Sequence, residues 1–221
     1  MNKVLVIAPH PDDETLGCGG SLFRHKKEGD KLFWLIITNL HLKEGWSKRS
    51  IKQRDDEIRK VSESYQFEEK FILNYKTTKV DIYPIADIIE EISIILKKIG
   101  PQVIYMPYAN DVHTDHYITA NAIQSSIKWF RCPSINKVLM YETLSETNFN
   151  FFGFSKFHPN VYLDISKYIN QKIETMNIYS SELGIHPFPR SEKVIKAQAT
   201  LRGSQSGFEA AEAFQLVYER K

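Results

Sequence analysis

Short apolar runs alternate along this chain with longer amphipathic segments, and this alternation limits the possible fold more than any other feature. The apolar runs are rich in Val, Ile, Leu and aromatic residues, as buried strands are, and they cover residues 4–8, 32–38, 71–73, 103–106 and 138–141. Segments with helical periodicity lie between them, at residues 21–28, 51–65, 85–98 and 116–128. This order predicts a three-layer α/β/α, Rossmann-like fold with a mainly parallel sheet.

The segment at 85–98 shows the helical pattern most clearly. Its isoleucine and leucine residues recur at steps of three and four, so they form one apolar face. Pro84 precedes the segment and Gly100 follows it, which is the asymmetry typical of helix ends. We therefore expect an amphipathic helix here that packs against the sheet.

The second half of the chain is less regular. Residues 148–157 are rich in aromatic side chains without any period, which indicates a loop or a pocket wall. We expect a strand at 161–164, helices at 165–179 and 193–201, and a final short helix or strand at 210–218. The sequence has no internal repeat, linker or shift in composition, so residues 1–221 are predicted to form a single domain.

The composition narrows the classes of partner. Apolar residues make up 42% of the chain and charged residues 25%, as in ordinary globular proteins. With 29 basic and 27 acidic residues, the formal net charge of +2 argues against nucleic acid or an anionic membrane as the main partner. Two cysteines form neither a disulfide framework nor a CxxC metal motif.

The N-terminal residues bear on where in the cell the protein is located. Only four strongly apolar residues, 4–7, precede Pro9, which is far too short a run for a signal peptide. No stretch reaches the ~18–20 apolar residues that a membrane-spanning helix needs. We expect a cytoplasmic protein without a membrane span; its oligomeric state is left open.

The first cluster of titratable residues directly follows the first predicted strand. It reads His10-Pro11-Asp12-Asp13-Glu14, and ligands of open α/β sheets bind at the carboxyl ends of strands. His10 and Asp13 are three residues apart on a loop stiffened by two prolines, so both side chains can converge on one ion. Asp12 must then point elsewhere. The alternative is that these acids only cap the following helix.

A second cluster, at residues 107–116, follows the strand predicted at 103–106. It places two histidines and two aspartates within six residues, which packing alone hardly explains. Together with His10 and Asp13, it offers nitrogen and oxygen ligands suited to Zn²⁺ or Fe²⁺. Three protein ligands and an open position are typical of a catalytic metal site, whereas structural zinc is normally closed by four ligands.

The motif AxHPDDE, with HxDH downstream, resembles the PIG-L/LmbE-like family of metal-dependent N-acetyl sugar deacetylases. Further similar motifs extend over nearly the whole chain: Arg54-Asp55-Asp56-Glu57, residues 159–166 with Lys172, and Arg202-Gly203, Gly207 and Glu212-Ala213-Phe214. One departure is Tyr179-Ser180-Ser181-Glu182, where the family often ends its motif in Gln. The acidic side chain of Glu182 bears on which substrate is accepted and not on the type of reaction.

The resemblance implies an enzyme that removes the acetyl group from an N-acetylated amino sugar or its conjugate, releasing acetate and a free amine. It implies that His10, Asp13 and His116 bind Zn²⁺, with Fe²⁺ possible, that Asp12 is the general base, and that His113 stabilises or protonates the intermediate.

Physical reasoning gives the same division of roles. Asp12 is the free carboxylate beside the ligands, where it can deprotonate a water whose pKa a metal has lowered. His113, as an imidazolium, is expected to stabilise the oxyanion. Asp115 is expected to accept the other N–H of the His113 ring, which would set its tautomer and favour its charged form.

Other residues allow two interpretations. Arg54 could hold a substrate phosphate or hydroxyl, as the resemblance suggests, or pair with an acid on its helix. Gly17-Cys18-Gly19-Gly20 could form a phosphate loop, although close helix–strand packing is favoured because the adjacent acids would repel a pyrophosphate. Dispersed aromatic residues such as Trp46 and Trp129 could stack on a sugar ring, but such residues more often belong to the core.

Two alternative functions stay open at this stage. The first is another metallohydrolase such as a phosphoesterase, although phosphoryl chemistry commonly uses two metal ions. The second is a nucleotide-binding module without catalysis, which rests on the fold and the glycines alone.

Overall fold

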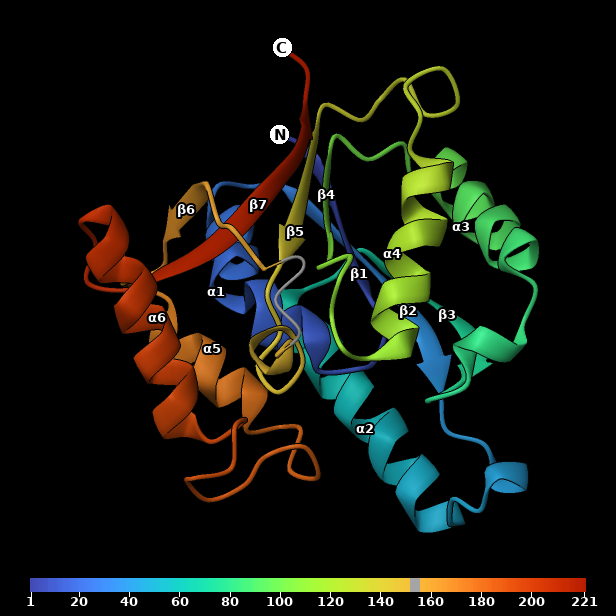
Figure 1. Ribbon diagram of the computed structural model, residues 1–221, viewed down its shortest axis with the longest axis horizontal. Coiled ribbons are helices and arrows are strands. Elements are labelled where there is room, and N and C mark those ends of the chain that lie inside the picture. Colours follow the sequence, from blue (N-terminus) through green and yellow to red (C-terminus); the bar gives the residue numbers. More distant parts are fainter. Residues whose placement is uncertain (152–155) are drawn as a thin grey trace.

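A seven-stranded sheet runs through the middle of the molecule (Figure 1). The computed structural model describes residues 1–151 and 156–221. Its strands are β1 (Lys3–Ala8), β2 (Lys31–Asn39), β3 (Glu69–Lys76), β4 (Val103–Pro107), β5 (Lys137–Tyr141), β6 (Val161–Asp164) and β7 (Ala211–Glu219). Their order in the sheet is β3-β2-β1-β4-β5-β7-β6. The first five strands are mutually parallel, and β7 pairs antiparallel with both β5 and β6.

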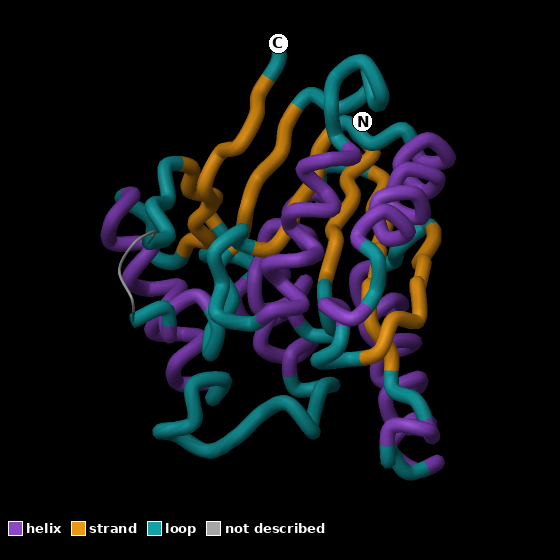
Figure 2. Tube along the Cα trace, turned by 45° about the vertical axis from the view of Figure 1, so that its right-hand side comes forward, coloured by secondary structure: helices purple, strands orange, loops and turns teal. Residues whose placement is uncertain are grey.

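Helices cover both faces of this sheet. They are α1 (Asp13–Lys27), α2 (Lys48–Tyr65), α3 (Ile85–Ile99), α4 (Thr114–Ser126), α5 (Ile169–Met176) and α6 (Glu192–Ser206). Helices α3 and α4 pack on one face, while α1, α2, α5 and α6 pack on the other (Figures 1 and 2). Short 3-10 turns occur at Leu42–Glu44, Val80–Ile82 and Thr147–Phe149. The three-layer α/β/α fold with a mainly parallel sheet is thereby confirmed.

Strand β1 shows why these strands read as continuous apolar runs. Val4 and Val6 point into the core under α1, whereas Leu5 and Ile7 point into the core under α3 and α4, and all four are fully buried. A strand that is covered on both faces needs apolar residues at every position rather than at every second one.

The point where the strand order reverses positions the candidate site. From β1 the chain builds β2 and β3 on one side, and it then crosses to place β4 and β5 on the other side. The carboxyl ends of β1 and β4 are therefore neighbours, and the two motif loops leave the sheet there. Ligands of doubly wound folds bind at such a reversal.

The glycine-rich segment belongs to α1, so this helix begins at Asp13 and not at residue 21 as the sequence predicted. Cys18 interrupts the helix with non-helical torsion angles (φ −145°, ψ 21°). A Cβ atom on Gly17 would lie 2.2 Å from Tyr141 Cδ2, and one on Gly20 would lie 2.7 Å from Ile165 Cγ2. The glycines thus permit close helix–strand packing, as favoured from the sequence.

Other boundaries differ from the expectation in smaller ways. The short apolar run at 71–73 lies inside the longer strand β3, and the segment expected as a helix at 165–179 is helical only in α5. The last element is the strand β7. In the segment expected as a loop, Thr147–Phe149 form a 3-10 turn, and residues 152–155 lie outside the described residues.

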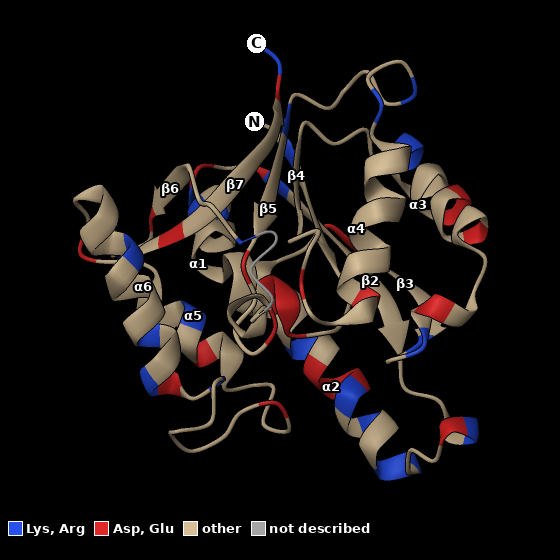
Figure 3. Ribbon diagram, viewed as in Figure 1, with Lys and Arg blue, Asp and Glu red and all other residues tan. Residues whose placement is uncertain are grey.

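Charged residues of both signs lie on the outer helices. Acidic and basic residues are interspersed on α2, α5 and α6, in keeping with the near-neutral net charge (Figure 3). Within the described part of the chain, none of the helices is long and apolar enough to span a bilayer.

Candidate metal centre and active site

The loops that follow β1 and β4 bring three potential metal ligands together. His10 and Asp13 come from the first loop and the first residue of α1, and His116 comes from the first turn of α4. Asp13 Oδ2 lies 3.3 Å from His10 Nδ1 and 3.2 Å from His116 Nε2. The three ligand atoms lie within 4.8 Å of one another, so one cation can contact all three.

The chemistry of His116 fits a metal ligand. Its Nδ1 is hydrogen-bonded to the Asp111 carboxylate at 2.9 Å, so the neutral ring has its lone pair on Nε2. His116 Nε2 is buried and has no hydrogen-bond partner among the residues described. An unsatisfied buried polar atom costs about 1–3 kcal/mol, and a bound cation would remove this cost. Two imidazoles and one carboxylate form a set that suits zinc or ferrous iron.

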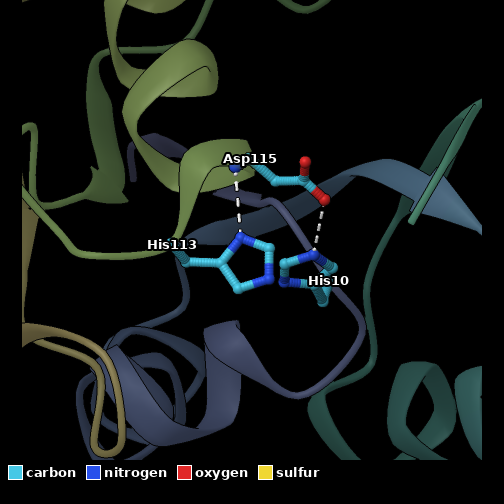
Figure 4. Close-up of side chains that lie close together, drawn as sticks. All are labelled: His10, His113 and Asp115. Carbon is cyan, nitrogen blue, oxygen red and sulfur yellow. Dashed lines mark hydrogen bonds and ion pairs between the residues drawn. The ribbon is translucent and has the colours of Figure 1, made fainter. Parts of the chain in front are cut away.

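Asp115 orients His10 rather than His113, which corrects the sequence-based expectation. Its carboxylate is hydrogen-bonded to His10 Nε2 at 3.0 Å (Figure 4). It also accepts the backbone N–H groups of Thr78 at 2.7 Å and Val80 at 3.0 Å, beyond the end of β3. His10 is left with Nδ1 facing Asp13, as a metal ligand requires.

His113 is held by a backbone group. It is the N-cap residue of α4, and its Nδ1 accepts the Asp115 backbone N–H at 3.1 Å (Figure 4). The neutral ring therefore carries its proton on Nε2. Burial and the nearby His10 and His116 rings lower the pKa of His113 to about 4. At neutral pH it is a neutral Nε2–H donor, and not the imidazolium that we expected.

The pKa of His10 is raised by its carboxylate partners. Burial lowers the pKa of His10, but its hydrogen bonds to Asp115 and Asp13 outweigh this effect and raise it to about 9. A metal ligand must be unprotonated, so a cation that bound His10 would have to displace a proton from this ring.

Asp12 lies beside the three ligands without contributing to them. Its side chain is buried, and Oδ2 lacks a hydrogen-bond partner in the described part of the chain. Nη1 of Arg190 lies 3.8 Å from Asp12 Oδ2. Burial, together with Asp13 and Glu182, raises the pKa of Asp12 well above its usual value. A buried free carboxylate next to a metal set is suited to proton transfer.

A cavity of about 330 Å³ opens over this cluster. Besides the metal set, Asp12 and His113, it is lined by Trp46, Arg54, Glu146, Glu182 and Arg190, among others. Its volume is in the range of small-molecule sites, which begins at about 300 Å³. Of the aromatic residues considered for sugar stacking, Trp46 lines this cavity, and Phe152 lies outside the described residues.

Arg54 is buried and paired with acids. Its Nη1 donates to the Pro11 carbonyl oxygen at 2.8 Å, and its Nη2 forms an ion pair with Glu182. Its Nε lies 3.4 Å from Glu57 Oε2 on the same helix. Both interpretations of Arg54 therefore have support, because it lines the cavity and is also paired.

Glu182 joins two arginines at the rim of the cavity. Its Oε1 contacts Arg54, and its Oε2 lies 3.3 Å from Nη2 of Arg190. Arg190 carries no signal in the sequence, because it lies in an irregular loop without a motif. No role was predicted for Asp111, although this residue belongs to the second cluster and its position there was the available signal.

His10, His113 and Asp115 form an overlapping group of possible ligands at the same site, and a separate group, His25, Glu28 and Asp30, lies at the other end of α1. Both ring nitrogens of His25 already have partners, Asp30 Oδ2 at 2.8 Å and the Tyr105 hydroxyl at 2.9 Å. This group therefore connects the end of α1 to the sheet.

The family model of PIG-L, described as GlcNAc-PI de-N-acetylase, matches residues 5–127. The chain belongs to the PIG-L family. The match confirms the resemblance drawn from the motifs and supports the expectation of a deacetylase. It contains both motif loops and Arg54, whereas Glu182 and Arg190 lie beyond it.

This PIG-L chain is also similar to individual proteins of known sequence or structure. It is 24% identical to diacetylchitobiose deacetylase of Thermococcus kodakarensis, over 98% of this chain and 84% of the relative. Its fold is similar to the conserved protein TT1542 of Thermus thermophilus, with a TM-score of 0.80, 24% identity, and coverage of 100% and 97% of the two chains. It is also similar to GalB of Pseudomonas putida, a 4-carboxy-2-hydroxymuconate hydratase, with a TM-score of 0.75, 14% identity, and coverage of 100% and 98%. The fold alone therefore does not define the reaction.

Proposed function

We propose that this PIG-L chain is a divalent-metal-dependent hydrolase that removes the acetyl group from an N-acetylated amino sugar or its conjugate. The observation that carries the proposal is the convergence of His10, Asp13 and His116 at one cavity, with the free carboxylate of Asp12 beside them. The relative named diacetylchitobiose deacetylase supports the class of substrate. The partner is a small molecule, for which the cavity has a suitable volume.

His10 through Nδ1, Asp13 and His116 through Nε2 would hold the cation. Zinc is the first candidate and ferrous iron the alternative, because both accept imidazole and carboxylate ligands. When bound, such an ion polarises the amide carbonyl and lowers the pKa of a water molecule from 15.7 to about 7. Asp111 and Asp115 would keep the two imidazole rings oriented for this purpose.

Asp12 is assigned as the general base. Its carboxylate takes a proton from the attacking water, and the same proton is then available to the amine as the carbon–nitrogen bond breaks. Its side chain is buried at the base of the cavity, next to the three candidate ligands. The products are acetate and a free amine.

His113 is assigned as the donor to the oxyanion. Because the Asp115 backbone N–H occupies Nδ1, the Nε2–H group is the one available to the developing negative charge. A donor of this kind is typically worth about 10²–10³ in rate. The neutral ring suits this role, because it already carries the Nε2–H proton that it donates. It does not have to take up a second proton from solvent first.

The rim of the cavity offers groups suited to a sugar ring. Trp46 is 43% exposed and lines the cavity, so its face can pack against the apolar side of a pyranose. Glu146 and Arg190 line the same cavity and provide polar atoms for hydroxyl groups. These residues lie outside the two motif loops, where specificity can vary without affecting the metal set.

The other functions considered from the sequence have less support. A phosphoesterase commonly needs two ions about 3.5–4 Å apart, whereas the second ligand set at this site, His10, His113 and Asp115, shares His10 with the first. A nucleotide-binding module would need the glycine segment free for phosphate, but a Cβ on Gly17 or Gly20 would collide with packed side chains.

The direct test is turnover of N-acetylated sugars by zinc-loaded protein. N-acetylglucosamine, diacetylchitobiose and simple N-acetylglucosaminides are incubated with the enzyme, and released amine and acetate are both measured. We expect equal amounts of the two products from at least one sugar, and none from Asp12→Asn, which retains zinc. No amine from any sugar, or full activity in Asp12→Asn, would contradict the proposal.

A further inference from the structure

Two buried polar side chains, Arg54 and Glu14, hold the two polar atoms of one peptide group. Arg54 Nη1 donates to the Pro11 carbonyl oxygen at 2.8 Å. The backbone N–H of Asp12 donates to Glu14 Oε2 at 3.1 Å. This carbonyl and this N–H belong to the same planar peptide group, so the two hydrogen bonds together fix the orientation of its plane. We call this arrangement the Pro11–Asp12 clamp.

The clamp acts directly on the backbone of Asp12. The φ angle of Asp12 is the rotation about the bond from this clamped N–H to its Cα, and it has the value 136°, with ψ at −28°. Residues with a Cβ atom rarely adopt such positive φ values. They keep them only where the surroundings over-determine the conformation, and such positions cluster at functional sites.

The clamping residues are themselves fixed. Glu14 is fully buried, and its Oε1 accepts the hydroxyl groups of Thr15 at 2.6 Å and Tyr179 at 2.9 Å. Its Oε2 is thus aimed at the Asp12 N–H. Arg54 is held by Glu57 and Glu182 on the other side of the peptide.

Pro9, two residues before Pro11 in the same loop, is also fixed. The Pro9 carbonyl oxygen accepts both the backbone N–H of Thr38 at 3.1 Å and its hydroxyl at 2.9 Å. The loop is therefore tied to β2 before Pro11, and the remaining freedom around Asp12 lies in the Pro11–Asp12 peptide.

We propose that Arg54 and Glu14 are positioning residues, which hold the Asp12 carboxylate in place by clamping the Pro11–Asp12 peptide. The proposal rests on the proposed function in so far as Asp12 is the base. It gives Arg54 a task on the backbone of the enzyme instead of on a phosphate or hydroxyl of the substrate. It also gives Glu14, the last residue of the HPDDE motif, a task other than binding metal.

The first test needs no substrate, so it can be read even if no sugar is turned over. In ¹⁵N-labelled, zinc-loaded protein, the proton shift and the hydrogen-exchange rate of the Asp12 amide are measured by NMR. We expect slow exchange in the wild type, and exchange at least about tenfold faster in Arg54→Met and Glu14→Met. Glu14→Gln keeps a carbonyl acceptor and should stay close to the wild type. An unchanged Asp12 amide in both Met variants would overturn the clamp.

The second test is a double-mutant cycle on turnover. A displacement of about 1 Å at a reacting group costs on the order of 10²-fold, so kcat should fall by this much in each Met variant while KM and zinc content stay within about twofold. Because both residues act on one peptide, the double variant should lose no more than the worse single variant. Losses that multiply, or a raised KM with an unchanged kcat in Arg54→Met, would overturn the shared clamp.

A matched control and a milder variant complete the design. Arg59→Met removes an exposed arginine of the same helix as Arg54, which pairs with Asp56 and Glu63 and takes no part in the clamp, and its kcat should stay within about threefold. If the two Met variants of the clamp do not fold, Arg54→Lys decides, because an ammonium group lacks the fork that bonds Pro11 and Glu182 at once. Faster exchange at the Asp12 amide and a lower kcat in Arg54→Lys support the clamp, and no change in either overturns it.

Discussion

The Asp111 carboxylate is hydrogen-bonded to His116 Nδ1 at 2.9 Å, and both side chains are buried. This contact fixes which ring nitrogen faces the candidate metal centre. Partners of this kind typically contribute 10–100-fold to metal affinity. We therefore expect Asp111→Ala to weaken zinc binding by about this factor, as measured by competition with a chromophoric chelator. Asp111→Asn, which keeps an acceptor oxygen, should lose less. Equal affinity in Asp111→Ala and the wild type would contradict the role of this contact.

The two histidines of the second cluster should respond differently to substitution. His113→Ala removes the proposed oxyanion donor, so kcat should fall by about 10²–10³ while zinc stays bound. His116→Ala removes a ligand and should lose zinc. Metal content by mass spectrometry, measured beside kcat, distinguishes the two. Release of zinc by His113→Ala would mean that the roles of the two histidines have been exchanged.

The buried ion pair between Lys172 and Glu212 should stabilise the kinked helix α1. Lys172 Nζ lies 2.6 Å from Glu212 Oε1 and donates to the Leu16 carbonyl at 2.8 Å, while Glu212 accepts the N–H groups of Gly20 and Ser21. Lys172→Met leaves a buried carboxylate without its cation, and we expect the free energy of unfolding to fall by about 3–5 kcal/mol. Urea unfolding measures this loss. The exposed pair of Lys196 and Glu192 provides the control, since Lys196→Met should change stability by less than about 1 kcal/mol.

Both cysteines should be unreactive in the folded protein. Burial raises the pKa of the Cys18 thiol and of the Cys132 thiol, so the fraction of reactive thiolate at pH 8 is lower than for a free cysteine. We expect slow reaction with Ellman's reagent in the native state and release of two equivalents in urea. Fast reaction of either thiol in the native state would show that its pKa is not raised.

The convergence of His10, Asp13 and His116 was within reach of sequence reasoning because it depends on backbone topology. His10 and Asp13 follow β1 and His116 follows β4, and a parallel sheet brings such loops together at its carboxyl edge. The orientation of Asp115 depends instead on which way its side chain points, and residue spacing does not encode this. The Asp115 carboxylate is hydrogen-bonded to His10 and to the backbone N–H groups of Thr78 and Val80. All three partners lie 35 or more residues away in the chain.

The start of α1 shows a different limit. Three glycines in four residues argue against a helix, and the sequence-based prediction therefore began it at residue 21. Tertiary packing outweighs that propensity, because Tyr141 and Ile165 fill the space that a Cβ on Gly17 or Gly20 would occupy. Arg190 was missed for a related reason, since only the folded chain brings its irregular loop to the cavity.

Glu182 contacts Arg54 on one side and Arg190 on the other, and Arg54 in turn contacts the peptide that precedes Asp12. A mutation at position 182 that adapts the enzyme to a new sugar would therefore also reach the base through a single intervening side chain. A change of substrate preference at position 182 would then also change the turnover rate. Such a change should call for compensating substitutions at residues 54 or 190.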